Sequence, residues 1–130
     1  MSSLDPLTKK TRKSPILFEE ILEVIKDDNI DQLLTLLDDD SIPNVNIKSG
    51  PGFEYSSLLH VASELGKISS VRLLLKYGAS INQENAELNT PITVACRTGH
   101  LDIVKLLHSR GADLDDEYIL LLLVKMVMRK

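Results

Sequence analysis

The chain repeats itself, and the repeat constrains its fold more than any other feature. Residues 56–82 align without a gap with residues 89–115. Matched positions carry identical or similar residues at a constant offset: Ser57 and Thr90, Ala62 and Ala95, Gly66 and Gly99, Val71 and Val104, Leu74 and Leu107, Gly78 and Gly111, and Ala79 and Ala112. A unit this short cannot bury an apolar face alone, so it must stack on its neighbours. The repeat therefore predicts an elongated solenoid.

The pattern inside one unit predicts two helices joined by a glycine turn. Residues 58–65 form the first helix, and Gly66 ends it because glycine adopts a positive φ at little cost. Residues 69–77 form the second helix, which Gly78 caps. The inward positions at helical spacing are Leu59 and Ala62 in the first helix and Val71, Leu74 and Leu75 in the second. The turn-rich residues 46–56 and 81–89 are expected to project as loops.

The motifs at the start of each unit resemble those of the ankyrin repeat. They read Ser57-Leu58-Leu59-His60-Val61-Ala62 and Thr90-Pro91-Ile92-Thr93-Val94-Ala95. Gly66-Lys67 and Gly99-His100 match the family's turn, and Gly78-Ala79-Ser80 and Gly111-Ala112-Asp113 match its repeat ends. The resemblance implies an all-α solenoid of stacked helix-turn-helix units with projecting finger loops.

The same resemblance suggests how the chain is divided. We expect a basic tail (1–13), an N-terminal capping repeat (14–46), a repeat with an enlarged finger (47–82), a third repeat (83–115) and an apolar C-terminal cap helix (116–130). In the first repeat Ser14-Pro15 is a suitable helix start, and Asp28-Asn29-Ile30-Asp31 takes the place of the Gly-His-Leu-Asp turn. Leu33, Leu36 and Leu37 form its apolar stripe.

Two departures from the family pattern affect the loops. The finger before Ser57 is three residues longer than the finger before Thr90. His60 has no counterpart in the next unit, where Thr93 stands. In the family this histidine ties neighbouring loops, so one tie is expected to be lost or replaced.

Composition argues against several functions. The net charge is −4, with 15 basic and 19 acidic residues, which disfavours a nucleic-acid partner. No apolar run is long enough to span a membrane, no secretory signal core is present, and the single cysteine cannot form an internal disulfide. We therefore expect an intracellular, chiefly cytoplasmic protein. The basic stretch Lys9-Lys10-Thr11-Arg12-Lys13 resembles a nuclear-import signal, which leaves a nuclear location open.

Candidate catalytic and metal-binding groups have simpler structural explanations. Cys96 occupies a small-residue position of a helix, and His100 lies in the helix turn, where it is interpreted as a capping residue. His60 is interpreted as the loop tie, and His108 as an outer-face residue. The run Asp38-Asp39-Asp40 lacks the alternating spacing of a calcium loop, and Gly50-Pro51-Gly52 lacks the context of a phosphate loop. We expect no enzyme activity, no cofactor and no metal.

The remaining function is non-catalytic protein binding, as in a scaffold. Similarity to ankyrin proteins suggests that a partner of unknown identity contacts the fingers and the concave helix face, through Phe53, Glu54, Ser56, Glu64, Leu65, Ala86, Glu87, Asn89, Arg97 and Thr98. Phe53 and Tyr55 are candidate anchors, although either could instead fold under its loop.

The apolar stretch near the C-terminus supports two alternatives. Residues 119–124 read ILLLLV, so a helix there would be apolar nearly all round. It could cap the array, or residues 118–128 could form a homodimer in a structural, oligomerising module. Alternatively, the chain is the N-terminal regulatory fragment of a larger ankyrin protein.

Overall fold

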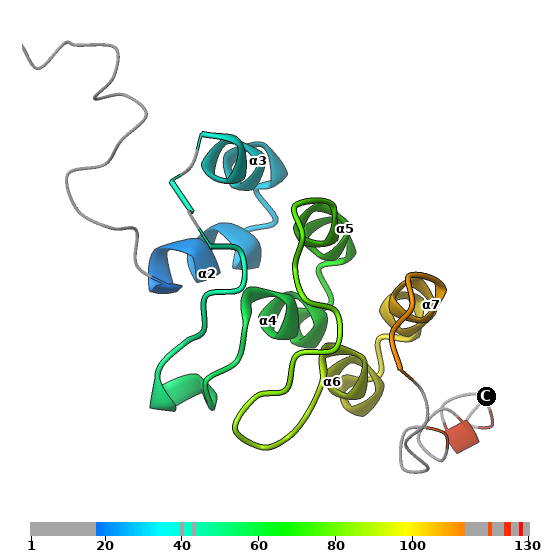
Figure 1. Cartoon of the computed structure of the whole chain (residues 1–130). Helices are drawn as coiled ribbons and strands as arrows, with labels where there is room; N and C mark the ends of the chain where they lie inside the picture. The colour runs from blue at the N-terminus through cyan, green and yellow to red at the C-terminus, as the bar shows by residue number, and fades with distance from the viewer. Residues whose placement is uncertain are drawn as a thin grey trace, which may run out of the picture.

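The structure is a computed structural model that describes residues 18–39, 41–42, 44–113, 120, 124–125 and 128. Its elements are α2 (Phe18–Lys26), α3 (Ile30–Asp38), the short 3₁₀ helix η1 (Pro51–Phe53), α4 (Leu58–Leu65), α5 (Ile68–Lys76), α6 (Pro91–Thr98) and α7 (Leu101–Ser109) (Figure 1). The helices expected at residues 58–65 and 69–77 are thus present, the second displaced by one residue.

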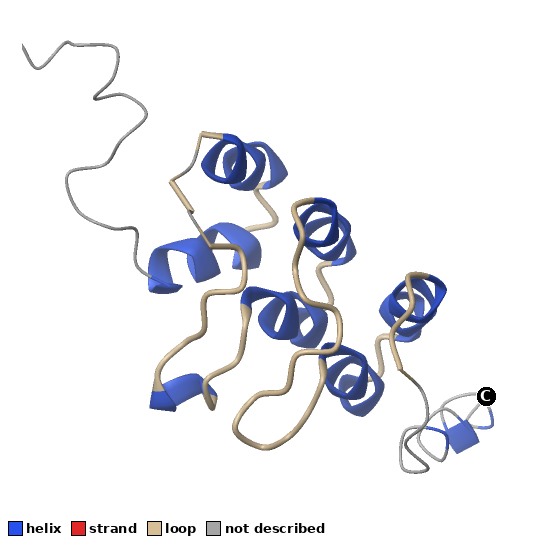
Figure 2. Ribbon diagram, viewed as in Figure 1, coloured by secondary structure: helices blue, strands red, loops and turns tan. Residues whose placement is uncertain are grey.

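The helices form two layers. α2, α4 and α6 lie side by side in one row, and α3, α5 and α7 form a second row packed against it. The two loops that precede α4 and α6 project from the side of the first row (Figure 2). This arrangement confirms the predicted all-α ankyrin solenoid and places both fingers next to the first helices of their repeats.

Polar side chains fix where the helices of the first row begin. Ser57 Oγ accepts a hydrogen bond from the His60 amide, while His60 Nδ1 accepts one from the Ser57 amide. Such a reciprocal pair satisfies two amides that a helix start leaves without partners. α6 begins similarly at Thr90, whose side chain accepts from the Thr93 amide, and Pro91 occupies the first helical position.

The turns between paired helices share one backbone geometry. Gly66 and Gly99 have φ of +76° and +82°, as predicted for glycines that end helices. The amide after each glycine donates to a carbonyl five residues back, Lys67 to Ala62 and His100 to Ala95. Asp28 takes the same place in the first repeat, with φ of +56° and the equivalent hydrogen bond from Asn29 to Val24. The first repeat therefore makes this turn with a residue that adopts it at a cost.

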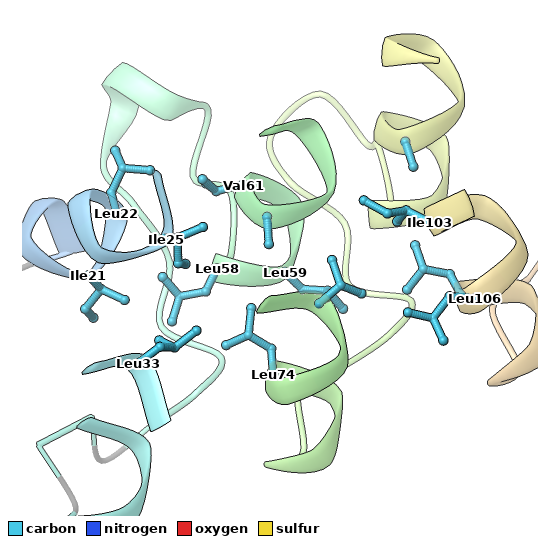
Figure 3. Packing of buried hydrophobic residues seen from close by; sticks show 14 of the residues in the cluster. Ile21, Leu22, Ile25, Leu33, Leu58, Leu59, Val61, Leu74, Ile103 and Leu106 are labelled. Carbon is cyan, nitrogen blue, oxygen red and sulfur yellow. The ribbon is translucent and has the colours of Figure 1, made fainter. Parts of the chain in front are cut away.

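The core runs continuously between the two layers (Figure 3). The predicted inward positions Leu59, Ala62, Val71 and Leu74 are buried, as are Leu33, Leu36 and Leu37. Leu75 is only partly buried and packs against this core. Since each helix buries only one face against its neighbours, the other faces remain available to solvent.

Several predictions fall on parts of the chain that are outside the described residues. They are the basic tail (1–13), the helix start at Ser14-Pro15, Asp40 and most of the C-terminal cap helix (116–130). The described positions of that last segment, residues 120, 124, 125 and 128, are helical, and Leu120, Val124 and Met128 are exposed. The domain boundaries remain predictions.

Candidate binding hollow between the fingers

A hollow of about 290 Å³ lies between the two fingers and the exposed ends of α4 and α6. It is lined by Glu54, Ser56, His60, Glu64, Asn85, Glu87, Asn89, Val94, Arg97 and Thr98. Seven of these ten residues belong to the binding set suggested by the sequence. The structure thus brings together residues from two loops and two helices that are far apart along the chain.

The two fingers present equivalent residues to this hollow. At the offset of the repeat, Glu54 corresponds to Glu87 and Tyr55 corresponds to Leu88. Both glutamates line the hollow, while Tyr55 and Leu88 are 48% and 73% exposed. Each exposed apolar side chain is therefore flanked in sequence by residues that line the hollow, Ser56 and Asn89 completing the pattern. Each finger, which forms part of the rim of the hollow, therefore carries the same order of a carboxylate, an apolar residue and a polar residue: Glu54-Tyr55-Ser56 and Glu87-Leu88-Asn89.

Hydrogen bonds join the fingers to each other. The Ala86 amide donates to the Glu54 carbonyl at 2.9 Å, and Asn85 Nδ2 donates to Ser56 Oγ at 3.2 Å. Asn85 and Ser56 are both buried, so these groups are held by the fold. The relative position of the fingers is therefore set before any partner arrives, which reduces the entropic cost of binding.

His60 connects α4 to the second finger, which is the loop before α6. Its Nε2 lies 2.7 Å from the Asn89 carbonyl oxygen, and its Nδ1 lies 2.8 Å from Ser57 Oγ. Because a carbonyl only accepts, Nε2 carries the proton and Nδ1 accepts from the Ser57 amide. The loop tie predicted for this histidine is confirmed. Burial lowers the pKa of His60 below its ordinary value, so the ring is held neutral.

Thr93 occupies the place of His60 in the third repeat and makes no such tie among the described residues. Its hydroxyl lies 3.1 Å from Thr90 Oγ1, within its own helix start. A threonine side chain is too short to repeat the span made by His60. The hydrogen bond between His60 and the Asn89 carbonyl is therefore a long-range tie that the third repeat does not repeat, and it lies beside the hollow.

Asn85 organises the second finger and was missed by the sequence reasoning. Its side-chain oxygen accepts from the amides of Glu87 and Asn89, both at 3.0 Å. Asparagine commonly stabilises turns in this way, so its place in the loop was a usable signal. Val94 was also missed, because it reads as a core position. His60 was assigned only its structural role.

No ion pair within the described residues neutralises the charges in the hollow. Glu54, Glu64 and Glu87 face one base, Arg97, and the ion pair found in the described part of the chain is Lys26–Glu23, on α2. Glu64 and Arg97 occupy equivalent positions at the ends of α4 and α6. A carboxylate in the last turn of a helix gains nothing from the helix dipole. The hollow is thus net acidic for no evident structural reason.

The other predicted binding residues lie outside the lining. Phe53 is 40% exposed, and its ring centre lies 6.2 Å from that of Phe18 at the start of α2, so it helps to attach the enlarged finger. Leu65 is 39% exposed at the end of α4. Ala86 contributes its backbone hydrogen bond. Tyr55 does not fold under its loop.

The side chains considered above as catalytic or metal-binding candidates show no arrangement for such a role in the described structure. Cys96 is buried, and burial raises the pKa of its thiol to about 11. His108 is exposed on α7. His100 stands at the start of α7 but its side chain makes no capping bond, so the predicted capping role is wrong. Its ring bonds Thr98 Oγ1 at 2.9 Å and lies against Gly66. Among the described residues, no three His, Cys, Asp or Glu side chains form a group that could hold a metal.

The comparison with known protein families agrees with this fold. A family model for ankyrin repeats in three copies matches residues 21–118. The chain belongs to the ankyrin-repeat family. Ankyrin repeats generally mediate protein–protein interaction, and the family is generally non-catalytic. No helix within the described ranges is both long and apolar enough to cross a membrane.

Similar proteins share the repeat region. Human protein phosphatase 1 regulatory subunit 27 is 46% identical over 57 residues, which cover 44% of this chain and 37% of the relative. Mouse palmitoyltransferase ZDHHC13 is 42% identical over 64 residues, 48% of this chain and 10% of the relative. Human rabankyrin-5 is 43% identical over 51 residues, 39% of this chain and 4% of the relative. The matches thus span much less than two thirds of any of these relatives.

Proposed function

We propose that this chain binds a partner protein without catalysis, through the hollow and the finger rim around it. The observation that carries the proposal is the hollow itself, where charged side chains without ion-pair partners meet on a rigid frame, next in sequence to the exposed Tyr55 and Leu88. None of these side chains is needed to fill the core. Exposed groups held by a rigid scaffold are typical of binding surfaces.

The relatives support a binding role but not a particular partner. The name of the phosphatase relative describes a regulatory subunit, and the transferase relative matches over only a tenth of its length. The shared part is therefore the repeat array in proteins of different activities. This is consistent with an adaptor function for the array.

The test is affinity capture from a lysate of the source cells, with partners identified by mass spectrometry. Arg97→Glu reverses a charge in the hollow. Arg72→Glu makes the same change on the exposed face of α5 and serves as the matched control. Circular dichroism must first show equal folding. We expect a partner that is retained by wild type and by Arg72→Glu and is lost with Arg97→Glu. Equal partner sets for all three proteins would remove the hollow as the working site.

A second candidate function is self-association through the C-terminal segment. Leu120, Val124 and Met128 are each helical and exposed, and they are spaced four residues apart in the sequence. Exposed apolar side chains at this spacing would share a face of a continuous helix, and such a stripe is typical of an interface. Light scattering after size exclusion tests it: a dimer that becomes monomeric with Leu120→Glu would support it, and a monomer at every concentration would exclude it.

A further inference from the structure

We propose that the partner enters the hollow as an extended, basic polypeptide segment, with lysine or arginine side chains over the carboxylates and apolar side chains on Tyr55 and Leu88. This inference rests on the proposed function and deepens it by naming the chemistry of the partner. It commits to a cationic segment of another protein.

The charge of the hollow determines the sign of the occupant. Three carboxylates and one guanidinium leave the hollow with a net charge of −2, since His60 is neutral. Glu54 and Glu64 make no side-chain ion pair in the described structure, and Glu87 receives only a long contact from Asn89 Nδ2 at 3.4 Å. A cationic side chain of the partner would be attracted to these carboxylates, which have no ion-pair partner among the described residues, and an anionic side chain would be repelled.

The exposed apolar side chains of the fingers indicate which residues accompany the basic ones in the bound segment. Leu88 is the most exposed apolar side chain of the two fingers, at 73%, and lies between two lining residues, Glu87 and Asn89. Tyr55 holds the equivalent place on the other finger. Apolar side chains that flank charged groups form the usual composition of a recognition surface, in which the apolar part contributes affinity and the charges contribute specificity.

The fingers bring two of the acidic residues close together. The Ala86 amide donates to the Glu54 carbonyl at 2.9 Å, so Glu54 lies beside the neighbour of Glu87. Glu64 and Arg97 lie instead on α4 and α6, which pack directly, and packed helices lie about 8–10 Å apart. An extended chain advances about 3.3 Å per residue, so a short extended segment spans this distance.

The experiment is selection of peptides from a random library on the immobilised full chain, followed by binding measurements with the selected peptides. Three variants are compared with wild type. Glu64→Gln removes one charge of the hollow, and Glu19→Gln, on the exposed face of α2, is its matched control. Leu88→Gly removes the apolar side chain at a position whose φ of +64° suits glycine.

We expect basic peptides with apolar residues and binding that weakens with salt. Glu64→Gln should weaken binding by about fivefold, and Glu19→Gln should leave it unchanged. Leu88→Gly should weaken binding by roughly tenfold while raising the melting temperature, a combination that a purely structural residue would not give.

Two results would overturn the inference. Selection of acidic or neutral peptides that depend on Glu64 and Leu88 would refute the cationic partner but leave binding at the hollow intact. Peptides that bind equally well to all variants, or no enrichment at all, would show that the hollow does not take a cationic segment. The capture experiment with Arg97→Glu then decides separately whether the proposed function fails.

Discussion

Gly66 and Gly99 end equivalent helices, but only one of them is also closely approached by another side chain. A Cβ atom built on Gly66 would lie 2.5 Å from His100 Nε2, whereas one on Gly99 would meet nothing within 4 Å. The substitution Gly99→Ala therefore imposes backbone strain alone. Gly66→Ala imposes the same strain and also displaces the His100 ring.

The magnitudes follow from these two contributions. An alanine held at a positive φ costs about 1–2 kcal/mol. Moving the ring breaks its hydrogen bond to Thr98 Oγ1, which adds about 1 kcal/mol. Each kcal/mol lowers the melting temperature of a domain this small by roughly 4–8 °C. Gly66→Ala should thus melt several degrees below Gly99→Ala.

Thermal unfolding followed by circular dichroism measures this difference, and a double-mutant cycle assigns it. In a His100→Ala background the obstructing ring is absent, so Gly66→Ala should cost no more than Gly99→Ala does. Equal destabilisation by the two glycine substitutions in the wild-type background would refute the close approach. So would an excess cost of Gly66→Ala that persists without His100.

Three further predictions concern buried or strained groups. Burial lowers the pKa of His60, so the unfolded chain gains a proton before the folded chain as the pH falls below about 6.5; stability should decline there, and the His60 ring signal in NMR should titrate below that value. A ring that titrates at or above it would contradict the prediction. The Cys96 thiol, with its pKa raised to about 11, should react with a thiol reagent at mildly alkaline pH only after unfolding in urea, and rapid labelling of the native protein would show that the thiol is accessible. Asp28→Gly should raise the free energy of unfolding by about 1 kcal/mol, because glycine adopts the φ of +56° without strain; urea denaturation would show no gain if the aspartate stabilises the turn.

The fold was largely predictable because its signals are local. Glycines that end helices, hydroxyls that start them and leucines at helical spacing act within a few residues of themselves. Even the place of Asp28 in the first turn followed from the match of Asp28-Asn29-Ile30-Asp31 to the Gly-His-Leu-Asp turn. The contact between Phe18 and Phe53 was not predictable, because it depends on the path of an enlarged loop past a neighbouring helix.

The candidate site was predictable to a lesser degree. The exposed positions of the fingers and helix ends follow from the repeat register, and most of them meet at the hollow. The hydrogen bonds that fix the hollow do not, because the bonds from Asn85 to Ser56 and from His60 to Asn89 each join residues 29 apart in sequence. The same long-range geometry explains the error at His100, whose ring contacts the preceding repeat instead of capping its own helix.

Comparison of the two full repeats within this chain separates the requirements of folding from those of binding. Positions that the core or the turns require keep their residue type, as Ala62 and Ala95 do. Positions around the hollow change, as in the exchange of Glu64 for Arg97, because packing does not constrain them. Glu54 and Glu87 are the exception, since both are exposed yet carry the same charge. No packing or ion pair in the described structure accounts for this repetition. A carboxylate presented by each of two adjacent fingers is what the positively charged partner proposed above would require.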